Sequence, residues 1–68
     1  MFSYNPLWKL LIDKGMNKDS LRLACGLSSS TVAKMGKGEY VSLEVINRIC
    51  AYFNCQPGDI IEYIPDKE

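Results

Sequence analysis

The stretch KDSLRLACGLSSSTVAKMGKG, residues 18–38, decides the fold because it contains two short helix signals with a turn between them. Asn17 can cap the first helix, since its side chain can accept a hydrogen bond from a free backbone N–H of the first turn. Leu21 and Cys25 then lie four residues apart on one side of the helix. Gly26 ends it, because glycine enters the left-handed conformation at no steric cost.

A second helix follows within a few residues. Ser28 can cap it, and Val32 and Met35 lie three residues apart on its inner face. A turn of about three to four residues with glycine at its first position sets two helices at roughly 90 to 120°. The spacing therefore predicts a helix-turn-helix over about residues 18–37, in which the second helix covers residues 29–37.

The outward face of this second helix carries short hydroxyls, a methyl group and two ammonium groups. These residues are Ser29, Ser30, Ala33, Lys34 and Lys37. An α-helix fits the major groove of DNA, where its N-terminal residues meet base edges. Short hydroxyls can contact bases or phosphates without holding the helix away from the groove floor, and lysines can reach guanine edges or phosphates. The face therefore predicts contact with double-stranded DNA.

Each of these features also has an ordinary structural explanation. Serine favours caps and turns wherever they occur, but Ser28 alone satisfies the need for a cap, which leaves Ser29, Ser30 and Thr31 for the groove. Lysines are common on any solvated surface, yet contact is the better interpretation on a helix that faces the groove. The positive ends of the helix dipoles, at Ser28 and at Lys18, add attraction for a phosphate.

Helix signals also flank the central stretch. Asn5 and Pro6 form a cap and first-turn pair for a helix over about residues 6–14, with Trp8 and Ile12 available to the core.

The C-terminal half begins with the most regular pattern of the chain. Ser42 opens an amphipathic helix whose apolar residues repeat at intervals of three and four. They are Leu43, Ile46, Ile49, Cys50 and Phe53. Pro57 suits the first turn of a short closing helix, although the alternation over residues 59–65 is also compatible with a short strand. We expect one all-α domain of five short helices over residues 1–68, with a C-terminal extension as a candidate for pairing with another chain.

The formal net charge of the chain is zero, but the charges are unevenly divided. Residues 1–37 carry six basic and two acidic side chains, a net +4, whereas residues 38–68 carry two basic and six acidic ones, a net −4. The local field at the basic end governs the encounter with an anion more than the total charge does.

Several function classes are disfavoured by composition. The three cysteines, Cys25, Cys50 and Cys55, include no CxxC pair, and the chain has no histidine, so we expect small core residues and no metal site. A phosphate-binding glycine loop, a nucleophile motif and an enclosed carboxylate pair are also missing from the sequence, which argues against an enzyme or a cofactor. No apolar run approaches the roughly 18 residues of a membrane span. We expect a soluble, unprocessed, cytoplasmic protein.

Nearly the whole chain resembles the Cro/C1-type, or Xre-like, helix-turn-helix regulators, especially the small stand-alone members. The similar segments are SYNPLWKLLIDKGM, KDSLRLACGLSSSTVAKMGKGE and VSLEVINRICAYFNCQPGDIIE. The resemblance implies a compact, lambda-repressor-like domain of five helices that regulates transcription, often as a homodimer on repeated half-sites. It places the first position of the motif on Lys18 and phosphate contacts on Ser28 and Thr31. The base-reading positions fall on Ser29, Ser30, Ala33, Lys34 and Lys37.

Two positions depart from the family pattern. A small residue usually follows the buried aliphatic at Leu21, but Arg22 stands here, with a long stem that can lie along the surface. Leu23 and Ala24 place apolar side chains on the usually polar side of the same helix. The alternative function is therefore a protein-interaction module that uses these two residues and the acidic half. We expect no small-molecule ligand, and the first candidates for a dimer surface are the closing helix and the final segment, residues 61–68.

Overall fold

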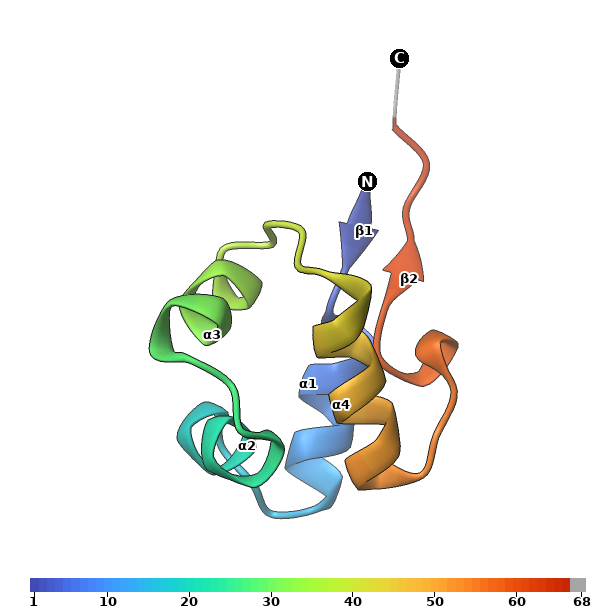
Figure 1. Ribbon diagram of the computed structural model, residues 1–68. Helices are drawn as coiled ribbons and strands as arrows, with labels where there is room; N and C mark the ends of the chain where they lie inside the picture. The colour runs from blue at the N-terminus through green and yellow to red at the C-terminus, as the bar shows by residue number, and fades with distance from the viewer. Residues whose placement is uncertain (67–68) are drawn as a thin grey trace.

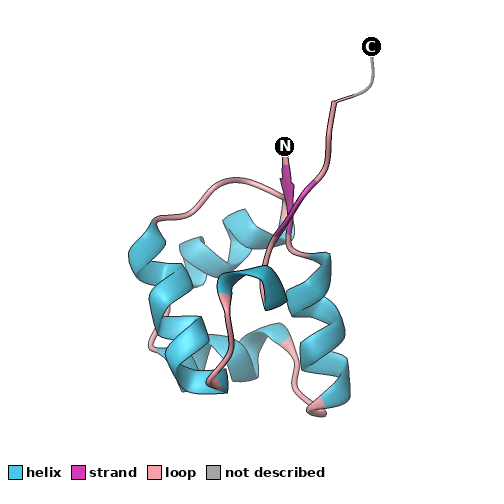
Figure 2. Ribbon diagram, turned by 90° about the vertical axis from the view of Figure 1, so that its right-hand side faces the viewer, coloured by secondary structure: helices cyan, strands magenta, loops and turns pink. Residues whose placement is uncertain are grey.

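A computed structural model describes residues 1–66 of the chain, which contain four α-helices (Figure 1). The elements in chain order are β1 (Phe2–Ser3), α1 (Asn5–Asp13), α2 (Lys18–Cys25), α3 (Ser29–Gly36), α4 (Leu43–Phe53), the 3-10 turn η1 (Pro57–Asp59) and β2 (Glu62–Tyr63). Helices α2 and α3 lie beside the α1–α4 pair, and the two strands project from the same end of the bundle (Figures 1 and 2). The all-α prediction is confirmed. None of the described helices is long and apolar enough to cross a membrane.

The core lies where the four helices meet. Its buried residues are Tyr4, Leu7, Leu11, Leu21, Cys25, Leu27, Val32, Met35, Ile46, Ile49 and Ile60. Cys50, Cys55, Trp8 and Phe53 pack against this cluster while staying partly exposed. Burial raises the pKa of the Cys25 and Cys55 thiols, which keeps both protonated near neutral pH.

Two residues expected in the core are outside it. Ile12 is 76% exposed, because Leu7 and Leu11 set the inward face of α1 and the next residue is turned about 100° away from it. Leu43 is 82% exposed because it is the first residue of α4, one turn before the buried Ile46.

The start of α1 also differs from the prediction. The helix includes Asn5, and no side chain caps it from the preceding position, Tyr4. Tyr4 is instead buried, and its hydroxyl donates to the backbone oxygen of Glu39 over 2.7 Å, which ties the start of α1 to the loop after α3. The Ser3 hydroxyl accepts from the backbone N–H of Asn5. Burial of the tyrosine ring therefore fixes this end, and Asn5 does not cap it.

The predicted caps of the helix-turn-helix are confirmed. The Asn17 side chain accepts from the backbone N–H of Ser20 over 2.8 Å, and Ser28 accepts from that of Thr31 over 3.1 Å. Gly26 has φ 66° and ψ 36°, the left-handed conformation that ends α2. The Arg48 guanidinium of α4 donates to the backbone oxygen of Gly26 over 3.0 Å, so the turn is also held from outside.

Substitution of Gly26 by alanine is expected to cost about 1–2 kcal/mol of unfolding free energy, because an L-residue with a Cβ is strained in the left-handed region. The added Cβ would meet nothing closer than Arg48 Nη1 at 3.8 Å, so the backbone alone accounts for the loss. Gly58→Ala is the control, since its Cβ would enter open space at an ordinary φ. Urea denaturation measures both variants. Equal stability of the two would contradict the strain argument.

The predicted fifth helix does not form in the C-terminal segment. Pro57 begins only a single 3-10 turn, after which β2 pairs antiparallel with β1 in the register Phe2 to Tyr63 and Ser3 to Glu62. The strand alternative was therefore the better one for residues 62 and 63, and their partner is the N-terminus of the same chain. Residues 67 and 68 of the proposed dimer segment lie outside the described part.

Candidate nucleic-acid interface

The predicted contact residues gather on and around α3. Seven of the eight are exposed: Lys18, Ser28, Ser29, Ser30, Ala33, Lys34 and Lys37. The eighth, Thr31, is half-buried. Val32 and Met35 anchor the opposite side of α3 in the core, at 8% and 1% exposure. The helix therefore turns one polar face outward along its whole length.

The hydroxyl groups at the start of α3 have separate environments. Ser28 Oγ lies 2.8 Å from Thr31 Oγ1 and 3.1 Å from Ser30 Oγ, besides accepting the capping bond. These three hydroxyls thus form one small cluster around the cap. Within residues 1–66, no hydrogen bond engages the Ser29 hydroxyl, which is free for a partner outside the chain.

The two flanks of α3 face different helices. Ser29, Ala33 and Gly36 line a hollow shared with α2, whereas Ser28 and Thr31 line one shared with α4 and the turn. The α2–α3 hollow also contains the charged side chains Lys18, Asp19 and Arg22. The buried Val32 of α3 also lines this hollow. Cations from α2 therefore lie beside residues of α3 that the resemblance assigns to base reading.

The ammonium group of Lys18 is held by its surroundings. It lies 4.8 Å from the centre of the Trp8 ring, a distance at which a cation is attracted to the aromatic face. A Cβ at Gly36 would come within 3.2 Å of the Lys18 Nζ atom. The absence of a side chain at Gly36 thus allows this lysine to lie against the C-terminal turn of α3.

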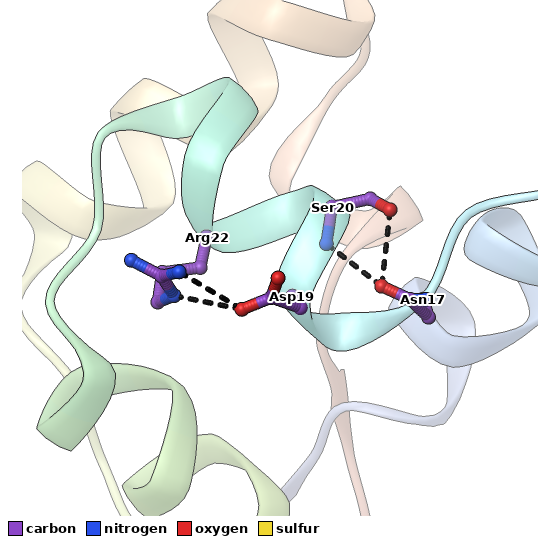
Figure 3. Close-up of polar contacts among 4 residues, drawn as sticks. All are labelled: Asn17, Asp19, Ser20 and Arg22. Carbon is purple, nitrogen blue, oxygen red and sulfur yellow. Dashed lines mark hydrogen bonds and ion pairs between the residues drawn. The ribbon is translucent and has the colours of Figure 1, made fainter.

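Arg22 is the position at which the resemblance leads us to expect a small residue. Its Nε and Nη2 atoms donate to Asp19 Oδ1 over 3.1 and 2.9 Å, and the two side chains lie together on one side of α2 (Figure 3). The arginine side chain is 32% exposed and lines the α2–α3 hollow, so the helices pack around it. The sequence contains a signal for this pair, an aspartate three residues before an arginine on one helix.

The apolar residues Leu23 and Ala24 line a separate hollow. Its other lining residues are Lys14, Met16, Ser20, Tyr52 and Phe53. Among residues 1–66, none of the acidic side chains expected to share this surface lines it. The interaction surface proposed from sequence is thus an apolar hollow with a basic neighbour, Lys14.

Comparison with known proteins gives a consistent result. The profile of the family described as "Cro/C1-type HTH DNA-binding domain" matches residues 6–66. The uncharacterized HTH-type transcriptional regulator YozG of Bacillus subtilis (strain 168) is 35% identical over 49 residues, which cover 72% of this chain and 58% of YozG. The crystal structure of transcriptional regulator VanUg, Form II, matches with a TM-score of 0.90 and 60% identity, over 96% of this chain and 87% of that one. Since the family profile covers nearly the whole chain, the protein belongs to the Cro/C1-type helix-turn-helix family of DNA-binding transcriptional regulators.

Proposed function

We propose that the protein binds specific sequences in double-stranded DNA by placing α3 in the major groove. The observation that carries the proposal is the outward stripe of α3, in which Ser30, Lys34 and Lys37 are all exposed while Val32 and Met35 fix the helix in the core. A helix anchored in this way can lay one face along base edges. Together with Ser29 and Ala33, this stripe forms the base-reading face.

Phosphate contacts surround that face. The ammonium group of Lys18 and the exposed Lys37 lie at the C-terminal end of α3, and the cluster of Ser28 and Thr31 lies at its positive dipole end. Such contacts set the position of the protein on the duplex, while base contacts select the sequence.

The active form in this proposal is a homodimer. A single module of this kind covers only about 600–1,000 Å² of surface, which limits its specificity. Two copies on half-sites about 34 Å apart double the contacts along one side of the duplex. The final segment, residues 61–68, is the first candidate for the dimer surface, and control by a small-molecule ligand is not part of the proposal.

Selection from a random pool of duplexes tests the sequence specificity. We expect the protein to enrich one sequence, and Lys34→Ala to weaken binding to it by about 1–3 kcal/mol, which is the energy of a good base contact. Binding is measured by fluorescence anisotropy on the selected duplex and on variants of it. The preference at one base pair is expected to relax together with the affinity.

Lys9→Ala provides the matched control for that experiment. Lys9 is an exposed lysine of α1 that lines a hollow with residues of η1, away from α3. It is expected to leave the affinity and the preferred sequence unchanged. A random pool without enrichment, or identical behaviour of the Lys34 and Lys9 variants, would remove α3 as the reading helix.

The alternative function is a protein-interaction module on the same fold. Its support is the hollow that holds Leu23, 66% exposed, and Tyr52, 52% exposed, since clustered apolar side chains favour protein contacts. Leu23→Ser is expected to weaken such a contact and to leave DNA binding unchanged.

A further inference from the structure

We propose that Arg22 reads a guanine in the operator and that Asp19 holds its guanidinium group in the reading position. This inference rests on the proposed function, because it assumes that α3 enters the major groove. Neither residue belongs to the predicted contact set. Both line the hollow between α2 and α3, beside Ser29 and Ala33 of the base-reading face.

The hydrogen bonds of the pair leave one edge of the guanidinium group free. Asp19 Oδ1 accepts from Arg22 Nε and Nη2, so it occupies the side of the group that faces along α2 (Figure 3). A guanidinium group has five N–H donors, and both hydrogens on Nη1 and one on Nη2 remain. Within the described residues, no acceptor engages Nη1. This remaining fork matches the O6 and N7 acceptors of guanine in the major groove.

The other surface arginine of the helix bundle shows the contrast. Arg48 donates from Nη1 to the backbone oxygen of Gly26 and from Nη2 to Glu44 Oε1. Both of its terminal nitrogens are therefore engaged inside the protein, and its role is to hold the turn. In Arg22 a single acidic partner fixes the group and leaves its end open.

The negative charge of Asp19 favours a base over a phosphate as the ligand of the Arg22 guanidinium group. Asp19 Oδ1 lies 2.9 Å from Arg22 Nη2, and the aspartate is itself 68% exposed. A phosphate bound by the same guanidinium group would come close to this negative charge and be repelled by it. A guanine edge carries acceptors but no net charge. The pair therefore favours the base.

Asp19 has a second effect in this arrangement. Its negative charge lowers the attraction of the α2–α3 hollow for any duplex, and it restricts the arginine to one orientation. Loss of the carboxylate charge is expected to tighten binding to unrelated DNA while the selectivity for one guanine falls. A residue with only a structural role would not change these two quantities in opposite directions.

The experiment uses the full chain and the duplex that the wild-type protein selects from a random pool. Affinities are measured for the wild type, Arg22→Lys, Arg22→Gln and Asp19→Asn, on that duplex and on variants with each base pair changed. One further duplex carries 7-deazaguanine, which lacks the N7 acceptor, at the assigned position. Thermal unfolding of each variant verifies that it is folded.

We expect the wild type to discriminate against replacement of one guanine by about 5- to 150-fold. Arg22→Lys and Arg22→Gln lose this discrimination at that one base pair, and 7-deazaguanine weakens the wild type but not Arg22→Gln. Arg22→Lys keeps the charge but lacks the rigid fork, so its salt dependence stays near that of the wild type. Asp19→Asn reduces the same discrimination and tightens binding to unrelated duplex.

The contrary outcomes are distinct. If Arg22→Gln weakens binding to all duplexes equally and lowers the magnitude of the salt slope by about 1.8 for the two protomers, Arg22 contacts a phosphate and the inference is wrong. Unchanged preference in all three variants would overturn it as well. Failure of the wild type to enrich any duplex overturns the proposed function, and this inference with it. Enrichment that depends on Lys34 but not on Arg22 overturns this inference alone.

Discussion

Binding of the proposed dimer to its selected duplex is expected to weaken about a hundredfold when the salt concentration rises from about 50 to about 200 mM. The reason is that each phosphate neutralised by a cation releases counterions from DNA, and added salt opposes this release. In the proposed complex, Lys18 and Lys37 neutralise about two phosphates in each protomer. Four such contacts give a log-log slope of about −3.6, since each contributes about −0.9. Anisotropy titrations at several salt concentrations measure this slope.

Single lysine variants measure how much each lysine contributes to the salt dependence of DNA binding. Lys18→Ala in both protomers removes two contacts, so the slope is expected to fall by about 1.8 in magnitude while the preferred sequence stays the same. Lys9→Ala again serves as control and leaves the slope unchanged. A slope near zero for the wild type would contradict the DNA-binding proposal and favour a protein partner. A steep slope without sequence preference would leave only non-specific binding.

Leu21→Ala is expected to lower the free energy of unfolding by about 2–5 kcal/mol, because the substitution leaves a cavity in the core. Leu21 of α2 is fully buried in the same core cluster as Met35 of α3, so it helps to join the two helices of the helix-turn-helix. A domain of this size has a total stability of about 3–10 kcal/mol. The variant is therefore expected to be largely or partly unfolded at 25 °C, with a lower urea midpoint and weaker DNA binding.

Leu23→Ala is the matched control for this loss. It removes the same atoms from the same helix, but Leu23 is exposed, so its effect on stability is expected to stay within about 0.5 kcal/mol. Circular dichroism during urea denaturation measures both variants. If the two leucines cost the same free energy, the assignment of the inward face of α2 is wrong.

The sequence predicts the helix-turn-helix well because its signals are local. Asn17, Gly26 and Ser28 each act on backbone groups within three or four residues, so the rules for caps and turns are sufficient. The inward pairs, such as Val32 and Met35, also follow from helical spacing alone. These features place the outward face of α3, although which base each residue contacts remains a proposal.

The sequence-based predictions that the structure contradicts involve contacts between residues far apart in the sequence. Tyr4 is buried by the loop after α3, and β2 finds its partner about sixty residues away, at the N-terminus. Helical spacing likewise cannot tell that Leu43 lies beyond the edge of the core. The sequence contains Arg22 and Asp19 three residues apart, but the free edge of the guanidinium group is visible only once the hydrogen bonds are known.

The pairing of β1 with β2 makes the backbone nearly a closed ring. Met1 and Ile64 exchange backbone hydrogen bonds of 3.0 and 2.7 Å across almost the full length of the chain. Closing a loop of this length has an entropic cost that no local contact offsets, so the ends can meet favourably only after the helices between them have packed. We therefore expect the helix-turn-helix to assemble early and the termini to join last. In the folded protein we expect this junction to open before the helices separate, because Phe2, Glu62 and Tyr63 are exposed while the helices share the buried core.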